Sequence, residues 1–598
     1  MVKGGTSVPV GAFSTHRLNQ LLGKSLFSEE LVEALENLGC DVDGLDTLVL
    51  QSCPSCHILL ERFESSSPIQ QCKECGYEGE APFPEVQKTE VIRLDLLADR
   101  PDLLDVAGLT RALKGYLGIQ TGLPKYRVQK SKVEVQISPK APPYRPHILC
   151  ALVDLEVDTE ILREIMGLQE SLHWAIGRDR KLSSIGVYDL DTIEPPIQYT
   201  SVDPDSFAFA PLGMGDQEMT CKQILENHPK GVGYAHLLEK KEVFPILMDC
   251  KGQVLSMPPI INSEETKVKV GSSHLFVDVT GTDEKPVQDT LHTLLCSLAE
   301  LGGKIKSVNM IKGKKRLLSP ILEDRKITLN YERAQKWIGK DFSIKELNQY
   351  LKRMRLKGSK KEKKIYTISY PPYRSDIKHE VDIIEDIAIA IGYKNLEPAL
   401  VSTLTLGQER EEEVLSNQVR AVLTGLGFQE IMSLMQTTEE NHFTKLGLKP
   451  GDYVRIENPK TFGQNVVRCH LMTGILEVFQ KNRLAPKPQL FFEVGDVVFL
   501  DLEQETSTGQ ERRVVFGISD AGAGYADVRS VMDALLRELG REGEYEAYPH
   551  AAYIPGRTAR VRAGEWIGFL GEIHPQVLNN FDIPYPVAMG ELSFGRII

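Results

Sequence analysis

The amino-acid sequence predicts a multidomain protein of the α+β class. Its 598 residues allow about four domains at the usual length of roughly 150 residues each. Strand-like and helix-like runs occur in every part of the chain, and apolar residues make up 41% of it, as in ordinary globular proteins. Two Cys-x-x-Cys pairs near the N-terminus add a predicted metal-bound insertion. We place the domains at 1–130, 131–316, 317–397 and 398–598.

Composition argues against two classes of protein. No apolar run reaches the roughly 18 residues that a membrane helix needs, and the N-terminus lacks the apolar core of a signal peptide. We therefore expect a cytoplasmic protein with no membrane contact. The net charge of −13 argues against a protein that coats nucleic acid, so an RNA partner would need local basic patches. The stretches 304–316 and 352–364 are such patches, although solvated loops have the same composition.

The first region is predicted to be an α/β domain. Amphipathic helix patterns occupy 15–23 and 28–40, and a strand followed by a helix is predicted between 90 and 118. Four of the ten cysteines interrupt this region as two pairs separated by fifteen residues. In a reducing compartment free thiols or a redox pair are alternatives, but this spacing favours a structural Zn²⁺ ribbon held by Cys53, Cys56, Cys72 and Cys75.

The second region is predicted to be a strand-rich α+β domain. Apolar runs punctuated by turn residues cover 145–295. From the residues alone, the segment 255–262, LSMPPIIN, is a loop in which two prolines fix the backbone. No Ser-His-Asp set is evident, so these residues do not by themselves indicate a reaction.

The most informative stretch is 370–393, YPPYRSDIKHEVDIIEDIAIAIGY. Its prolines cannot continue a helix, so we expect a helix that begins near Asp376. Acidic residues in a first turn complement the helix dipole, which would make this an ordinary solvated helix end. Clustered carboxylates are also the ligands that a hard cation such as Mg²⁺ prefers. The helical spacing predicts a buried face of Ile377, Val381, Ile384, Ile387 and Ile391, and a second face of Asp382, Glu385 and Asp386.

This stretch resembles the signature of the β subunit of phenylalanyl-tRNA synthetase, of the archaeal and eukaryotic type. The resemblance implies that Asp376, Asp382, Glu385 and Asp386 hold a Mg²⁺ shared with a catalytic α subunit. The segment Arg100–Leu103, RPDL, resembles another segment of the same family, with an expected structural role in subunit docking. The Cys₄ ribbon departs from the family pattern and is predicted from its spacing only.

The resemblance also implies that 131–316 is an editing domain, which hydrolyses tyrosine wrongly attached to the phenylalanine tRNA. A synthetic site cannot strongly reject an isostere that only adds a hydroxyl, so a second site that hydrogen-bonds this hydroxyl is needed. The matching blocks are 173–189, 245–262 and 276–283. We expect Leu247 and Ser256 to line the site, and Asp249, Asn262, Asp278 and Thr280 to supply polar contacts to the tyrosyl group, the terminal adenosine or a water.

The last two regions complete the resemblance. Residues 317–397 read as two helices, at 327–339 and 343–358, followed by a basic hairpin, and resemble a winged-helix-like module. From about Pro398 the helix and strand pattern resembles a class II synthetase core, an antiparallel sheet domain. Arg468, Glu493 and Arg557 stand roughly where class II motif residues would lie, but the constellation is incomplete. This module is therefore predicted to lack catalysis and to bury surface against the α subunit.

The whole pattern predicts a β subunit in an (αβ)₂ heterotetramer that joins phenylalanine to tRNA(Phe). ATP would be used at the α-subunit site with Mg²⁺, and the β chain would edit tyrosyl-tRNA. Two alternatives remain open at this point. One is a freestanding tRNA deacylase or adaptor, and the other is a nucleic-acid-binding regulator built on the winged-helix-like module.

Overall fold

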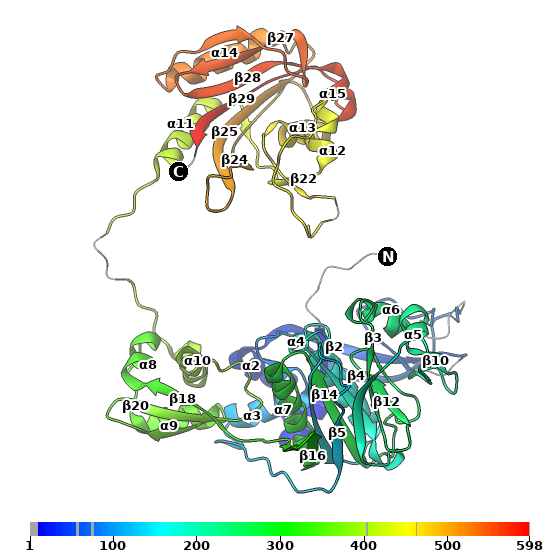
Figure 1. The fold of residues 1–598 in the computed structure, drawn as a ribbon. Coiled ribbons are helices and arrows are strands. Elements are labelled where there is room, and N and C mark those ends of the chain that lie inside the picture. The colour runs from blue at the N-terminus through cyan, green and yellow to red at the C-terminus, as the bar shows by residue number, and fades with distance from the viewer. Residues whose placement is uncertain are drawn as a thin grey trace. The chain divides into compact units, whose positions relative to one another are not determined.

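The computed structural model describes residues 10–55, 59–72, 77–79, 81–401, 403, 405–461 and 463–596. The chain forms two compact units, Thr6–Leu400 and Val401–Ile598 (Figure 1). Within the described residues, none of the helices has the length and apolar character needed to cross a membrane.

The first region is a split β-α-β arrangement with order β1-β4-β2-β3. Strands β1 and β2 run parallel to each other and are joined by α1 and α2, while β4 lies between them and pairs antiparallel with both. All direct pairings are antiparallel, so the predicted α/β class is wrong here and the region is α+β. The elements are β1 (Val10–Ser14), α1 (Thr15–Leu22), α2 (Ser28–Leu38), β2 (Asp41–Ser52), β3 (Leu59–Phe63), β4 (Glu85–Asp95) and α3 (Val106–Tyr116).

The second region packs two sheets face to face. A seven-stranded sheet, β13-β12-β11-β8-β5-β16-β17, lies against a four-stranded sheet, β15-β6-β14-β7, across a core that contains Tyr188, Leu247 and Phe276. The other face of the smaller sheet is covered by α4 and α7. Both faces of β7 and β14 are therefore covered, and every residue of the two strands except His274 is buried.

Its helices are α4 (Thr159–Ala175), α5 (Cys221–Asn227), α6 (Pro229–Tyr234) and α7 (Glu284–Glu300). Its strands are β5 (Glu134–Ile137), β6 (His147–Asp154), β7 (Ser183–Asp189), β8 (Ile197–Val202), β9 (Ala208–Phe209), β10 (Met219–Thr220), β11 (Phe244–Met248), β12 (Val254–Met257), β13 (Ile261–Asn262), β14 (His274–Gly281), β15 (Lys304–Lys306), β16 (Val308–Lys312) and β17 (Lys315–Ser319).

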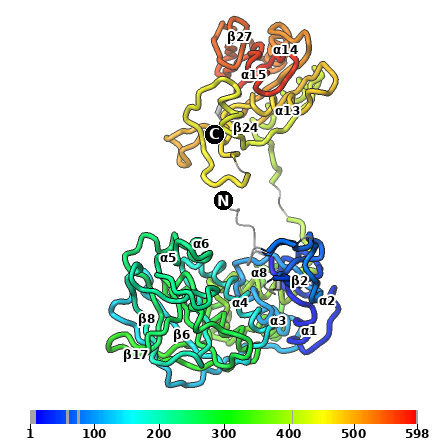
Figure 2. Tube along the Cα trace, turned by 90° about the vertical axis from the view of Figure 1, so that its right-hand side faces the viewer, coloured from blue at the N-terminus to red at the C-terminus, as the bar shows by residue number. Residues whose placement is uncertain are grey.

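The third region combines an antiparallel sheet, β18-β20-β19, with three helices. The predicted helix at 327–339 is partly wrong, because its first residues alternate in burial and form β18. One apolar core runs through all three regions, and α3 contacts both α7 and α9. In Figure 2 the α1–α3 trace lies on one side of this unit and the β6 and β8 trace on the other. The elements are β18 (Arg325–Asn330), α8 (Tyr331–Ile338), α9 (Ile344–Arg353), β19 (Lys357–Lys360), β20 (Ile365–Tyr370) and α10 (Glu380–Ile391).

The second unit is built on a seven-stranded sheet, β21-β24-β25-β29-β28-β27-β26, in which only the β21–β24 pair is parallel among the described strands. Helices α11 and α14 pack on one core and α13 and α15 on another. The elements are α11 (Glu411–Gly425), β21 (Gln429–Glu430), β22 (Gln436–Thr437), α12 (Glu439–His442), β23 (Val466–Val467), α13 (Met472–Lys481), β24 (Gln489–Leu500), β25 (Thr508–Ser519), α14 (Tyr525–Glu538), β26 (Glu544–Ala547), β27 (Tyr553–Ala563), β28 (Trp566–Ile573), α15 (Pro575–Asn580) and β29 (Val587–Arg596).

Candidate functional site

The second region contains a cavity of about 390 Å³. It opens where the ends of β7, β12 and β13 meet α4. Its lining is mostly apolar with a few polar groups, the usual character of a small-molecule pocket. Three of the predicted site residues, Ser256, Asn262 and Asp278, line it. Other lining residues are Leu162, Met166, Glu170, Arg180, Ser184, Gly186, Tyr188, His228, Lys230, Pro258, Pro259, Ile261, Lys267 and Val268.

Three buried polar groups converge in this cavity. The Tyr188 hydroxyl lies 2.7 Å from Ser256 Oγ and 2.5 Å from Asp278 Oδ1, and all three side chains are at most 2% exposed. Burial raises the pKa of Asp278 to about 7. The Tyr188 pKa is also raised by burial, and next by the Asp278 charge, so its hydroxyl keeps its proton and donates to the carboxylate. The cluster can therefore present both an acceptor and a hydroxyl to a polar group that enters the cavity.

Gly186 makes this convergence possible. A Cβ at this position would lie 1.9 Å from the Tyr188 hydroxyl and 2.3 Å from Asp278 Oδ1. We expect Gly186→Ala to lower the free energy of unfolding by about 1–3 kcal/mol, because the buried groups must move apart. Urea unfolding followed by circular dichroism measures this.

The matched control is Gly167→Ala on the exposed face of α4, where a Cβ would meet nothing within 4 Å. Alanine favours a helix interior over glycine, so this change should leave stability equal or raise it by about 0.5–1 kcal/mol. Equal effects of the two substitutions would contradict the packing described for Gly186.

Charged side chains mark the mouth of the cavity. Glu170 on α4 accepts from Arg180 at 2.9 Å and from Lys230 at 2.9 Å, and Glu170 and Lys230 are about half exposed. Arg180 also donates to the Ile260 carbonyl at 2.8 Å, which ties the 258–260 loop to the turn after α4. In that turn Arg178, Asp179 and Arg180 all have φ between 49° and 66°, a conformation that costs most residues energy and is often found at functional sites.

The other three predicted residues lie near the cavity without lining it. Leu247 on β11 is fully buried and pairs with Ser256. The carboxylate of Asp249 accepts the backbone N–H groups of Glu194, Lys251 and Gln253, and so organises a turn. Thr280 Oγ1 accepts from Arg145 Nε at 2.9 Å and lies 3.1 Å from Ser184 Oγ. These positions favour supporting roles.

A second cavity, of about 350 Å³, lies between the first and third regions. All four predicted magnesium ligands, Asp376, Asp382, Glu385 and Asp386, line it, together with Arg100 and Arg374. Arg374 donates to Asp376 at 2.8 Å and to Asp386 at 2.9 Å, and Asp386 is 2% exposed. Burial raises the pKa of Asp386 to about 6 despite the neighbouring arginine.

The RPDL segment meets this cluster. Arg100 donates to Asp102 at 2.8 Å and lies 3.8 Å from Asp376. Two segments that are far apart in the sequence and were singled out separately thus form one ionic network in space. The buried charges of this network are paired and hydrogen-bonded, so they avoid the large free-energy cost of burying an isolated charge.

The helix that carries the acidic residues begins later than predicted. Asp382 accepts the backbone N–H groups of Lys378 and His379 at 2.6 and 2.7 Å, so α10 begins at Glu380 rather than near Asp376. Val381 is 42% exposed, so its predicted place on the buried face is also wrong. The late start removes Asp376 from the helix and leaves it beside Arg374.

The acidic set fits a Mg²⁺ only in part. Among the described residues, no three of these carboxylates bring oxygens within 4.8 Å of one another. Asp382 and Glu385 line the cavity without an arginine partner in the described part of the chain, whereas Arg374 neutralises Asp376 and Asp386. Carboxylate oxygens are the right donor type for Mg²⁺, so Asp382 and Glu385 are the residues best placed to reach it first.

The predicted zinc ribbon is described for two of its four cysteines. Cys53 and Cys72 are buried together with Phe83 in one small cluster, which fits two ligands of a common site. Cys56 and Cys75 lie outside the described residues. The Cys₄ site therefore stays a prediction.

In the second unit, the arginines that resemble class II motif residues are paired with acids. Arg468 donates to Glu493 at 2.6 Å, and both side chains are buried. Arg557 donates to Glu572 at 2.6 Å. The Arg557 side chain is 61% exposed, so its ion pair leaves donors free, and the predicted lack of catalysis in this module stays a prediction.

Several residues in or beside the two cavities were missed by the sequence reasoning. Tyr188 and Gly186 lie inside a block that was singled out, but strand alternation gives no signal for a buried hydroxyl cluster. Arg374 lies in the PPYRSD motif, two residues before Asp376, and this short spacing could have indicated that it pairs with the acidic residues. Arg145 and Arg180 reach their partners only through tertiary folding.

Comparison with known proteins gives consistent matches. Residues 398–594 match the family described as phenylalanyl tRNA synthetase beta chain CLM domain, and residues 327–393 match the tRNA synthetase B5 domain. The phenylalanine-tRNA ligase beta subunit of Methanothrix thermoacetophila is 38% identical over 85% of this chain and 93% of its own length. The protein of the same name from Methanosphaera stadtmanae is 34% identical over 99% of this chain and 100% of its own length.

A solved structure is also similar. The N-terminal fragment of the phenylalanyl-tRNA synthetase beta-subunit from Pyrococcus horikoshii is 32% identical, with a TM-score of 0.54. The match covers 64% of this chain and 99% of the fragment.

Proposed function

Because this chain belongs to the family of phenylalanine-tRNA ligase beta subunits, we propose that it works beside a catalytic α subunit and edits mischarged tRNA in its second region. The family is an aminoacyl-tRNA synthetase family that takes part in making phenylalanyl-tRNA. The single observation that carries the editing role is the buried Tyr188–Ser256–Asp278 cluster in an otherwise apolar cavity. The partner complex is an (αβ)₂ heterotetramer that uses ATP at the α-subunit site.

The cavity suits a tyrosyl group better than a phenylalanyl group. The aromatic ring lies among Leu162, Pro258 and Val268, and the phenol reaches Asp278 and Ser256 at the buried end. Phenylalanine has no hydroxyl to offer this cluster, whereas the phenol of tyrosine adds a hydrogen bond to the Asp278 carboxylate, so the cavity favours tyrosine.

The ester end then lies toward the mouth. Asn262 in the cavity wall can orient the attacking water, and Lys230 and Lys267 at the rim favour the phosphates of the terminal nucleotides. Water adds to the ester carbonyl, the bond to the ribose oxygen breaks, and that oxygen takes the proton, which releases tyrosine and intact tRNA.

The acidic cavity is proposed to take part in joining the subunits. Asp382 and Glu385, with Asp376 and Asp386 held by Arg374, would contribute to a Mg²⁺ shared with the α subunit. Such an ion neutralises charge between two acidic surfaces or beside a phosphate. The Cys₄ ribbon would hold a structural Zn²⁺, and the complex would act in the cytoplasm.

One experiment separates this function from its alternatives. The chain is expressed with and without a candidate α subunit, and both preparations are assayed for phenylalanine charging and tyrosyl-tRNA hydrolysis. We expect charging only when the α subunit is present and hydrolysis in both preparations. A chain that never co-purifies with an α subunit but still hydrolyses tyrosyl-tRNA would be a freestanding deacylase. One that binds DNA with steep salt dependence and needs no tRNA would be a regulator.

A further inference from the structure

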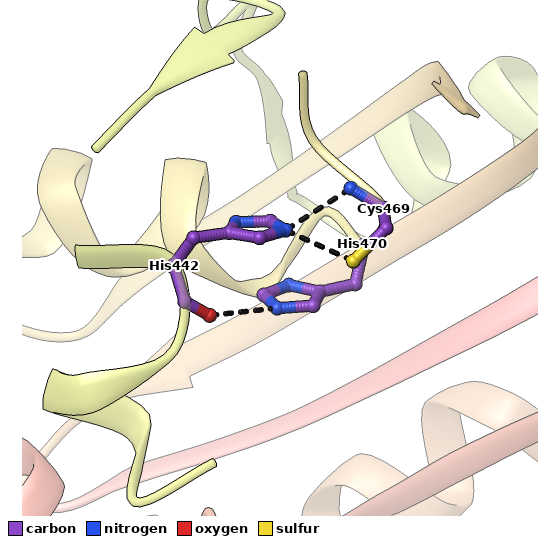
Figure 3. Close-up of side chains that lie close together, drawn as sticks. All are labelled: His442, Cys469 and His470. Atoms are coloured by element: carbon purple, nitrogen blue, oxygen red, sulfur yellow. Dashed lines mark hydrogen bonds between the residues drawn. The ribbon is translucent and has the colours of Figure 1, made fainter. Parts of the chain in front are cut away.

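A cluster of two histidines and a cysteine lies in the second unit, far along the chain from the predicted ribbon. His442 ends the short helix α12, and Cys469 and His470 lie between β23 and α13 (Figure 3). One ligand atom from each of the three side chains lies within 4.8 Å of the others, and this is the one such cluster among the described residues. His442 is fully buried, and the other two are partly buried.

The hydrogen bonds around the cluster determine which nitrogen of each imidazole ring carries the proton and which carries the lone pair. His470 Nε2 lies 3.1 Å from the His442 carbonyl oxygen and can only donate to it, so His470 Nδ1 carries a lone pair. This Nδ1 atom is buried and has no hydrogen-bond partner among the described residues. His442 Nδ1 lies 3.0 Å from Thr473 Oγ1, and its Nε2 faces Cys469, 3.2 Å from Sγ and 3.0 Å from the backbone N–H.

The outer hydrogen bonds of the two rings follow the pattern of metal-binding histidines. Such a histidine donates one ring N–H to a carbonyl or hydroxyl oxygen and presents the other nitrogen to the ion. A buried acceptor without a hydrogen-bond partner is unfavourable, so His470 Nδ1 would be stabilised by a ligand that binds it.

We propose that His442 Nε2, Cys469 Sγ and His470 Nδ1 form a binding site for a thiophilic divalent metal ion of the Zn²⁺ class. Two imidazoles and one thiolate are ligands that Zn²⁺ accepts in a tetrahedral site, with a water in the fourth position. Zn²⁺ replaces the thiol proton of Cys469, which leaves to solvent, and the Zn–S bond forms.

Binding requires a small local movement. The two imidazole rings now stack with centroids 3.8 Å apart and planes 7° apart, so their in-plane lone pairs cannot point at one ion. One ring must tilt, and His442 Nε2 must give up the Cys469 N–H. The ion would then fasten α12 to the start of α13, whose Met472 and Ile475 belong to one of the two cores of this unit.

A site-specific test uses the full-length chain and thiol alkylation. Cys469 and the exposed Cys250 are followed by mass spectrometry after treatment with iodoacetamide, in chelator and in added Zn²⁺. Only the free site reacts, so a Zn²⁺ concentration ten times Kd should slow Cys469 alkylation about tenfold and leave Cys250 unchanged. Equal Cys469 rates with and without Zn²⁺ would overturn the proposal. Because each cysteine is measured separately, zinc in the ribbon does not affect the result.

Two variants keep the fold while removing a ligand. His470→Gln retains a donor for the His442 carbonyl and removes Nδ1, and His442→Asn retains a donor for Thr473 and removes Nε2. Each should abolish the Zn²⁺ protection of Cys469 and lower the zinc content by one equivalent per chain. His16→Gln, on the exposed face of α1, is the control and should behave as the unchanged protein. Unchanged protection in both ligand variants would contradict the assignment of these ligands.

Discussion

Replacing Asp278 by asparagine is expected to slow the hydrolysis of tyrosyl-tRNA by roughly 10- to 150-fold, the value of one hydrogen bond to a charged group. Asparagine keeps the shape of the side chain but lacks the negative charge that strengthens the hydrogen bonds donated by the Tyr188 hydroxyl and by a bound phenol. Charging of tRNA with phenylalanine in the complex with the α subunit should be unchanged. Single-turnover deacylation and aminoacylation on the same preparations measure both.

The pH dependence gives this prediction a second readout. Burial raises the pKa of Asp278 to about 7, so enzymatic hydrolysis should rise as the pH passes through 7 and the carboxylate ionises. After subtraction of the spontaneous rate, the asparagine variant should lose this step and keep its reduced rate across the same pH range. If alanine at Ser256, Asp278 and Thr280 in turn left deacylation unchanged, the editing site would lie elsewhere.

The same group has a predictable effect on stability. An unfolded aspartate has a pKa near 3.9, so between about pH 4 and 7 the folded chain holds a proton that the unfolded chain has released. The contribution of Asp278 to stability therefore falls as the pH rises through this window. At pH 8 the Asp278→Asn variant should be more stable than the unchanged protein, which links the proposed editing role to a measurable cost in folding.

Substituting Arg374 by methionine is expected to destabilise the Thr6–Leu400 unit by about 3–5 kcal/mol, because it leaves a buried charge without its partner. Arg374 is 3% exposed and holds both Asp376 and Asp386, of which Asp386 has almost no contact with water. Guanidinium unfolding followed by fluorescence measures the loss.

The matched control is Arg333→Met. Arg333 pairs with Glu380 at 2.8 Å, but its side chain is 56% exposed, so the loss should be at most about 1 kcal/mol. A similarly small loss at Arg374 would mean that the network contributes little to folding. Its acidic members would then be available to a cation at little cost in stability.

The sequence predicted elements well where periodicity and residue type agreed. The helices of the first region, the long strands of the last region and the strand-rich second region all follow from apolar spacing. The start of α10 was misplaced because Asp382 acts as a cap, and spacing alone cannot tell a capping carboxylate from a ligand.

The sites were predictable only where chemistry lies in short motifs. Ser256, Asn262 and Asp278 were singled out by resemblance and share one cavity. Their partner Tyr188 comes from another strand, and the pairing of β14 with β7 brings it to Asp278. The His442, Cys469 and His470 cluster had no ligand spacing to reveal it, because its members meet only through the packing of α12 against the segment before α13.

One apolar core continues through the first three regions, so it limits where the chain can be truncated. A fragment that ends near residue 130 lacks both α7 and α9, and a fragment that ends near residue 316 lacks α9. In each fragment α3 loses packing contacts and buried leucines become exposed to water. An excised second region should therefore aggregate on expression, whereas a chain cut near residue 400 should remain monodisperse and retain the proposed deacylase activity. Gel filtration of the two truncations would distinguish these outcomes.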